Sequence, residues 1–162
     1  MEWTRGGLEA EGFSGFVRFA DLQFSQVPTA SGVYVIVRQF DHEPGFLPIN
    51  PAGRFKGKDP SVPRERLDAE WVAGAEVVYI GKASGGASGR RGLRKRLDEF
   101  RRFGVGDPIG HWGGRLIWQL EESDSLLVCW KDTDVEPALV ERAMILEFTA
   151  DFGRRPFANL RD

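Results

Sequence analysis

The sequence predicts an α+β fold in which helices flank a small, mainly antiparallel β-sheet of about three strands. Two observations carry this prediction. Short runs rich in β-branched and aromatic residues at 32–38, 76–82 and 126–130 are typical of strands with a buried face. Two longer segments, 92–103 and 135–152, have the composition and spacing of helices. The strands and helices therefore belong to one mixed fold.

The first helix is predicted by Leu93, Leu97 and Phe100, which stand at i, i+4 and i+7 and form one apolar stripe. Gly104 is a suitable stop for it. The second helix follows Asp134, an acceptable N-cap, and is expected to be largely buried because apolar residues dominate it. Between these helices, six residues at 115–120 fit either a short helix or another strand.

The chain has 162 residues, which is the usual length of a single domain. Residues 1–30 are expected to form an N-terminal extension that packs on the core, with a short helix around 19–24. The main domain covers 31–162. It contains an insertion at 39–70 with five prolines and three glycines, which predicts a long structured loop rather than a helix. A loop of this length in a compact domain is usually functional.

Composition excludes several classes of protein. Hydrophobic residues make up 41% and charged residues 28%, and the net charge of -2 argues against a protein that coats nucleic acid, although it allows a local basic face. The apolar runs are too short to span a bilayer. The single cysteine, Cys129, is interpreted as a packing residue and fits a reducing compartment. The sequence thus predicts a cytoplasmic protein without a membrane segment.

The helix at 92–103 carries an unusual concentration of positive charge. Residues 90–102 contain seven cations and two acids, a local net charge of +5. Most of the cations are expected on an exposed face. Arg96 borders the apolar stripe instead, and a half-buried arginine requires an anionic partner. That partner is either an internal carboxylate or a phosphate of the substrate.

Three further residues invite a functional interpretation. Glu147 falls on an apolar face of the last helix, so it is expected to pair with a cation such as Arg96 or to bind a metal. Glu141, beside Arg142, is interpreted as a structural or surface acid. His111, next to Trp112 and two glycines, is either a structural histidine whose hydrogen bonds are made within the protein, or a residue that contacts the substrate or the side chains that bind it.

Five short motifs in this order resemble the GIY-YIG nuclease superfamily over roughly residues 31–160. Gly32-Val33-Tyr34 matches the first motif and Tyr79-Ile80-Gly81-Lys82 the second. Residues 93–97 resemble the helix that presents the family's arginine, here Arg96. Glu147 matches the family's metal-binding glutamate, and Pro156-Phe157-Ala158-Asn159 matches its closing motif. Asn159 lies twelve positions after Glu147, the same spacing as in UvrC-type repair endonucleases.

The resemblance implies a catalytic set: Tyr34, Tyr79, Lys82, Arg96, Glu147 and Asn159. Glu147 would hold Mg²⁺ or Mn²⁺, and Arg96 would clamp a non-bridging phosphate oxygen. Tyr34 is favoured over Tyr79 as the acceptor of the water proton, with Lys82, Arg96 or the metal lowering the phenol pKa. The closing asparagine would orient a backbone group or a metal-bound water.

The implied function is a metal-dependent endonuclease that hydrolyses phosphodiester bonds in DNA. The alternative is a non-catalytic module of the same fold that binds nucleic acid or a protein. The predicted phosphate contacts are Arg90, Arg91, Arg94, Arg101, Arg102, Lys56 and Lys58, although 54–58 also fits a solvated loop tip. A homodimer or a protein partner that supplies target specificity is left open.

Two features depart from the family pattern. The insertion makes 44 residues separate Tyr34 from Tyr79, where the family usually has a short turn. Phe100 stands where repair-type members often carry a tyrosine. The first departure implies a substrate site specific to this subgroup, and the second removes one hydroxyl group.

Overall fold

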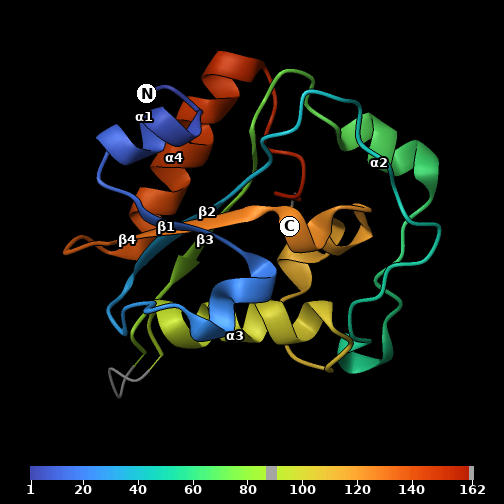
Figure 1. The fold of residues 1–162 in the computed structure, drawn as a ribbon, viewed down its shortest axis with the longest axis horizontal. Helices are drawn as coiled ribbons and strands as arrows, with labels where there is room; N and C mark the ends of the chain where they lie inside the picture. Colours follow the sequence, from blue (N-terminus) through green and yellow to red (C-terminus); the bar gives the residue numbers. More distant parts are fainter. Residues whose placement is uncertain (87–90, 161–162) are drawn as a thin grey trace.

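The computed structural model describes residues 1–86 and 91–160, which form an α+β fold with a four-stranded antiparallel sheet. The strand order is β1-β4-β2-β3 (Figure 1). The strands are β1 (Ser14–Arg18), β2 (Gly32–Val37), β3 (Val77–Ala83) and β4 (Leu127–Asp132). The last three correspond to the predicted strands, and β1 raises the number from about three to four.

The N-terminal 30 residues contribute one strand to this sheet. They supply α1 (Arg5–Ala10), β1 and the predicted short helix, a 3₁₀ helix η1 (Phe19–Phe24). β1 pairs with β4, and its register shifts between Gly15 and Val17, which marks a β-bulge. The extension therefore provides an edge strand as well as packing on the core.

Helices cover both faces of the sheet. Figure 1 shows α1 and α4 (Pro137–Phe152) on one face and α3 (Leu93–Gly104) on the other. The smaller helical elements are α2 (Arg64–Glu70) and the 3₁₀ helices η2 (Phe55–Gly57), η3 (Trp112–Gln119) and η4 (Ser123–Ser125). Residues 115–119 of the segment whose structure the sequence left open thus lie in the helix η3, and Leu120 forms an isolated antiparallel bridge with Phe46.

Alternation along β2 assigns its side chains to two cores. Val33 and Val35 are fully buried in the cluster that includes Phe148 of α4. Tyr34 and Ile36 are buried in the cluster that includes Leu97 of α3. Successive strand side chains point to opposite faces, so Tyr34 projects toward α3.

Two predictions about helices were wrong. The insertion at 39–70 contains a helix, α2, whose first turn follows Pro63 in extended conformation. Proline is compatible with a helix N-terminus, so the number of prolines in a segment does not exclude a helix that follows one of them. The last helix begins after Glu136 rather than Asp134, and it is less buried than predicted, because Leu139 and Leu146 are both 61% exposed.

Cys129 is buried and free. Within residues 1–86 and 91–160, the helices are too short or too polar to cross a bilayer.

Candidate active site

The two tyrosines come together because β2 and β3 pair in antiparallel register. Tyr34 lies opposite Gly81, and Tyr79 lies opposite Ile36. The two phenol ring centroids are 6.1 Å apart. The pairing of the two tyrosine motifs therefore brings both phenols to the α3 side of the sheet.

Gly32 and Gly81, the glycines of the two tyrosine motifs, lie where a larger side chain would clash with neighbouring atoms. A Cβ on Gly81 would lie 2.3 Å from Cζ and 2.5 Å from Oη of Tyr34, so the Tyr34 ring crosses the space that a side chain would fill. A Cβ on Gly32 would lie 2.2 Å from the carbonyl oxygen of Lys131 in β4. The glycines thus permit the close approach of a phenol in one case and of a neighbouring strand in the other.

A cavity of about 350 Å³ opens where these strands meet α3 and α4. The chemistry-bearing side chains that line it come from four elements and the segment before α3. They are Tyr34, Tyr79, Lys82, Arg91, Arg96, Glu99 and Glu141.

Arg96 reaches this cavity from the border of the α3 stripe, as predicted. It is half-buried, and its Nη1 donates to the carbonyl oxygen of Gly110 at 2.8 Å. Within the described residues no carboxylate lies in ion-pair distance of Arg96. A half-buried guanidinium with only a neutral carbonyl partner is well suited to bind an anion in the cavity.

The carboxylate of α4 that lines the cavity is Glu141, whose Oε2 lies 3.1 Å from Nζ of Lys82. Glu147 is half-exposed, pairs with the amino group of Met1, and does not line this cavity. The predicted position of Glu147 on a buried apolar face is wrong, although it does pair with a cation, one of its two predicted roles. The ion pair of Glu141 with Lys82 agrees with the structural alternative predicted for it. Because apolar residues occur all around α4, their pattern did not reveal which face meets the sheet.

His111 completes the site beneath the cavity. Its Nε2 lies 2.6 Å from the Tyr34 hydroxyl, and its ring stacks on Phe100 with centroids 3.7 Å apart. Both partners are buried, and Nδ1 of His111 has no hydrogen-bond partner in the described residues. Phe100 is thus a platform for a histidine that contacts Tyr34.

Burial alters the protonation of these groups. It raises the pKa of Tyr34 well above its ordinary value, and nearby Tyr79 raises it further. Burial raises the pKa of Tyr79 to about 12 despite the opposing charge of Arg96. Burial, with a smaller contribution from Arg96, lowers the pKa of His111 well below its usual range. At neutral pH the site therefore contains two phenols and a neutral imidazole.

Asn159 binds backbone, one of the two roles predicted for it. Its Oδ1 accepts from the Ile80 N–H at 2.9 Å, and its Nδ2 donates to the Ile80 carbonyl at 2.8 Å. This clamp fixes β3 at the residue after Tyr79. Asn159 thus positions the strand that carries the second phenol.

Most of the cations predicted to bind phosphates are paired within the protein. Arg101 lies 2.9 Å from Asp98, and Arg102 lies 3.0 Å from Asp107. Arg94 donates to the Val27 carbonyl oxygen at 2.8 Å. Arg91 contacts Glu99 at 2.8 Å at the rim of the cavity. Arg90 lies outside the described residues, and Lys56 and Lys58 lie in the insertion.

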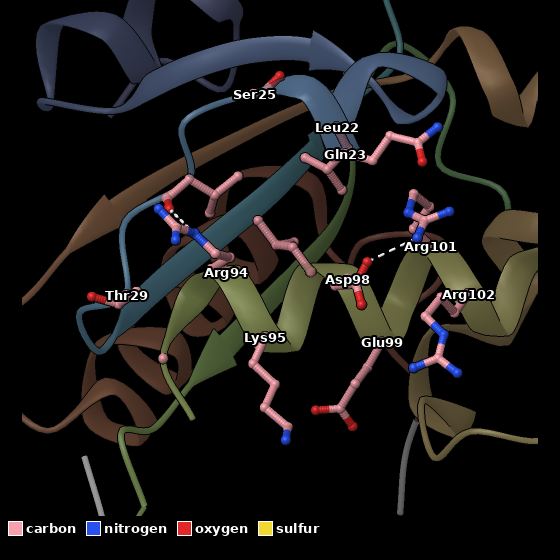
Figure 2. Close-up of a pocket in the computed structure, with 13 residues that line it drawn as sticks. Leu22, Gln23, Ser25, Thr29, Arg94, Lys95, Asp98, Glu99, Arg101 and Arg102 are labelled. Atoms are coloured by element: carbon pink, nitrogen blue, oxygen red, sulfur yellow. Dashed lines mark hydrogen bonds and ion pairs between the residues drawn. The ribbon is translucent and has the colours of Figure 1, made fainter. Parts of the chain in front are cut away.

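Several of these paired cations line a second, larger cavity of about 650 Å³ on the other flank of α3. Figure 2 shows Arg94 of α3 extending toward the segment that carries Ser25 and Thr29, Lys95 extending away from it, and Arg101 bonded to Asp98. Neither tyrosine contributes to this cavity.

The donor set at the smaller cavity limits which cofactor it can hold. Within the described residues no three Asp, Glu, His or Cys side chains cluster as metal ligands. Two half-buried carboxylates line it, Glu141 bonded to Lys82 and Glu99 bonded to Arg91, which fits Mg²⁺ because this ion keeps most of its waters and uses one or two carboxylates together with substrate phosphates.

Comparison of the chain with protein-family models, with curated proteins and with solved structures finds no match.

Proposed function

We propose that this protein is a metal-dependent endonuclease of the GIY-YIG type that hydrolyses phosphodiester bonds in DNA. The observation that supports this proposal is the convergence of two phenols, a lysine, a half-buried arginine and a carboxylate in one small cavity. Hydrolysis of a phosphodiester requires a proton acceptor for water, cations for the developing charge and a donor for the leaving oxygen.

The proton acceptor is Tyr34 acting with His111. Burial keeps His111 neutral, and its Nε2 lies 2.6 Å from the Tyr34 hydroxyl. In the proposed mechanism Nε2 is the acceptor and the Tyr34 hydroxyl is the donor. As water attacks phosphorus, the Tyr34 oxygen takes a water proton and passes its own proton to His111. The relay forms an imidazolium in place of a phenolate; burial disfavours both ions, and the negative charge that develops on the phosphate compensates the imidazolium.

The remaining groups stabilise the transferred charge and the leaving group. Arg96 binds non-bridging oxygens of the phosphate, and Lys82 adds a second cation. While the new bond from the water oxygen to phosphorus forms, the bond from phosphorus to the leaving oxygen breaks. Tyr79, whose raised pKa keeps it protonated, donates its proton to that oxygen.

Glu141 is the residue that would hold Mg²⁺ or Mn²⁺ in this site. When bound, such an ion supplies Lewis-acid stabilisation of the phosphate. Lys82, which is half-exposed and bonded to Glu141, keeps this carboxylate oriented toward the cavity.

The decisive experiment compares two glutamates of the same helix. Plasmid, single-stranded and branched DNA are incubated with Mg²⁺ and wild-type protein, Glu141→Gln or Glu147→Gln. We expect wild-type cleavage that a chelator abolishes, loss of cleavage in Glu141→Gln and wild-type rates in Glu147→Gln, because only Glu141 lines the cavity.

Cleavage that is lost in Glu147→Gln and kept in Glu141→Gln would contradict the assignment of Glu141. Binding of DNA without cleavage of any substrate would favour the non-catalytic binding module.

A further inference from the structure

The insertion and η3 together form a surface of cations and aromatic rings. We call it the insertion patch, and it consists of Phe55, Lys56, Lys58, Arg66, Trp112 and Arg115. Nζ of Lys56 lies 5.3 Å from the Phe55 ring centroid. Nζ of Lys58 and Cζ of Arg115 lie 5.9 and 4.5 Å from the Trp112 ring centroid. Two rings thus lie among four cations.

These four cations lack carboxylate partners. In the described part of the chain, no Asp or Glu oxygen lies within 4.0 Å of Lys56, Lys58, Arg66 or Arg115. Other arginines of the insertion are paired, Arg54 with Asp59 at 3.5 Å and Arg64 with Asp68 at 3.2 Å.

Mutual repulsion within the patch is also evident. Arg115 is partly buried, and burial followed by the charge of Arg66 lowers the pKa of its guanidinium. A cluster of uncompensated positive charge on a protein of net charge -2 favours a polyanionic ligand.

The patch connects directly to the candidate active site through three consecutive residues. The Gly110 carbonyl accepts from Arg96, and a Cβ on Gly110 would lie only 3.2 Å from Cζ of Phe55, so the Phe55 ring packs against this glycine. His111 contacts the Tyr34 hydroxyl. The next residue, Trp112, belongs to the patch.

We propose that the insertion patch binds unpaired nucleotides of the strand that flanks the cleaved phosphate, an inference that rests on the nuclease function proposed above. Bases stack on the half-buried rings of Phe55 and Trp112, while Lys56, Lys58 and the two arginines neutralise backbone phosphates. Duplex DNA keeps its bases stacked internally and cannot use these rings. The preferred substrate therefore carries a single-stranded segment beside the cleavage site.

Binding is measured without metal, so that cleavage does not interfere, by fluorescence anisotropy of a labelled oligothymidylate at several salt concentrations. Arg66→Gln and Lys58→Gln are each expected to reduce the log-log salt slope by about 0.7, the value for one phosphate of a single strand. The matched control is Arg5→Gln, which removes a cation of α1 that is bonded to Glu9, and its slope should equal that of the wild type.

The rings are tested separately. Trp112→Leu is expected to weaken binding of the oligothymidylate roughly 5- to 150-fold with an unchanged salt slope, because stacking carries no charge. Trp112→Phe keeps an aromatic ring and should retain most of the affinity, which separates lost stacking from misfolding. A duplex of the same length should be bound more weakly by the wild type and be indifferent to Trp112→Leu.

Equal affinity and slope in all these variants would overturn the proposal, as would tighter binding of the duplex or competition by polyglutamate but not by single-stranded DNA. Failure of this inference is distinguishable from failure of the nuclease function. If the wild type cleaves DNA and the patch variants bind and cleave like it, only the patch assignment falls. If the patch variants lose binding but no DNA is cleaved with Mg²⁺, only the nuclease function falls.

Discussion

The two cavities beside α3 differ in size and in the residues that line them, and the side chains suited to catalysis line the smaller one. The cavity of about 650 Å³ is lined by Arg94, Arg101 and Arg102, which form bonds to Val27, Asp98 and Asp107 respectively. The cavity of about 350 Å³ is lined by Tyr34 and Tyr79, whose pKa values are raised, and by Arg96, which within the described residues bonds to the Gly110 carbonyl and to no carboxylate. Two buried phenols with raised pKa values beside a half-buried guanidinium, rather than volume or number of charges, indicate where a substrate binds.

The largest expected effect concerns the phenol at the base of the smaller cavity. Tyr34→Phe should lower the single-turnover cleavage rate by roughly 10²–10⁴, the usual contribution of a positioned acid or base. Thr29→Val, which alters the lining of the larger cavity, should leave the rate unchanged. Equal rates for Tyr34→Phe and wild type would break the comparison between the two cavities.

A second prediction sharpens the role of Gly81. Gly81→Ala places a methyl group where the Tyr34 ring lies, so we expect a loss of about 1–3 kcal/mol in the free energy of unfolding and a lower cleavage rate. The measurement is urea unfolding together with the rate assay. Gly113→Ala is the control, because nothing lies within 4 Å of the added Cβ. Similar stability losses in both variants would contradict the steric argument.

A third prediction concerns the pH dependence of stability. The lowered pKa of His111 means that the unfolded chain binds a proton below about pH 6.5 while the folded protein does not. This contribution therefore makes stability fall as the pH decreases below that value, by up to about 1.4 kcal/mol per pH unit, and it is constant above it. His111→Gln should lose this part of the dependence, measured as the difference between the two proteins in urea unfolding between about pH 5 and pH 7.5.

The smallest effect is expected in the larger cavity. Arg102→Gln removes one partner of a half-exposed ion pair and should change the free energy of unfolding by only about 0.2–1 kcal/mol, with no effect on cleavage. Thermal unfolding and the rate assay measure both quantities. A loss of cleavage here would show that the larger cavity takes part in the reaction.

The sequence was sufficient to predict the elements whose local pattern matches their burial. β2 is apolar throughout, and the α3 stripe of Leu93, Leu97 and Phe100 is fully buried, so both were predicted nearly to their ends. β1 was missed because its burial pattern has only one fully buried residue, Phe16, and its bulge interrupts the alternation of side chains. Pairing with β4, a partner distant in sequence, determines that strand.

The candidate site could be predicted where strand pairing determines it and not where the orientation of a helix does. Pairing of β2 with β3 brings Tyr34, Tyr79 and Lys82 together, as predicted from the two motifs. The choice between Glu141 and Glu147 depends on which side of α4 faces the sheet, and outward-facing residues such as Leu139 make the sequence pattern uninformative. His111 was left open because its partner, Tyr34, lies 77 positions away in sequence.

The clamp formed by Asn159 also protects an exposed edge. β3 is an outer strand of the sheet, and its backbone receives the Ala158 N–H at the Val78 carbonyl as well as both bonds of the Asn159 amide. These contacts replace a fifth strand over a short stretch. Unpaired outer strands act as templates for the addition of other chains. A protein truncated before Pro156 would thus present the strand that carries Tyr79 to a second copy, and aggregation would accompany the loss of the site.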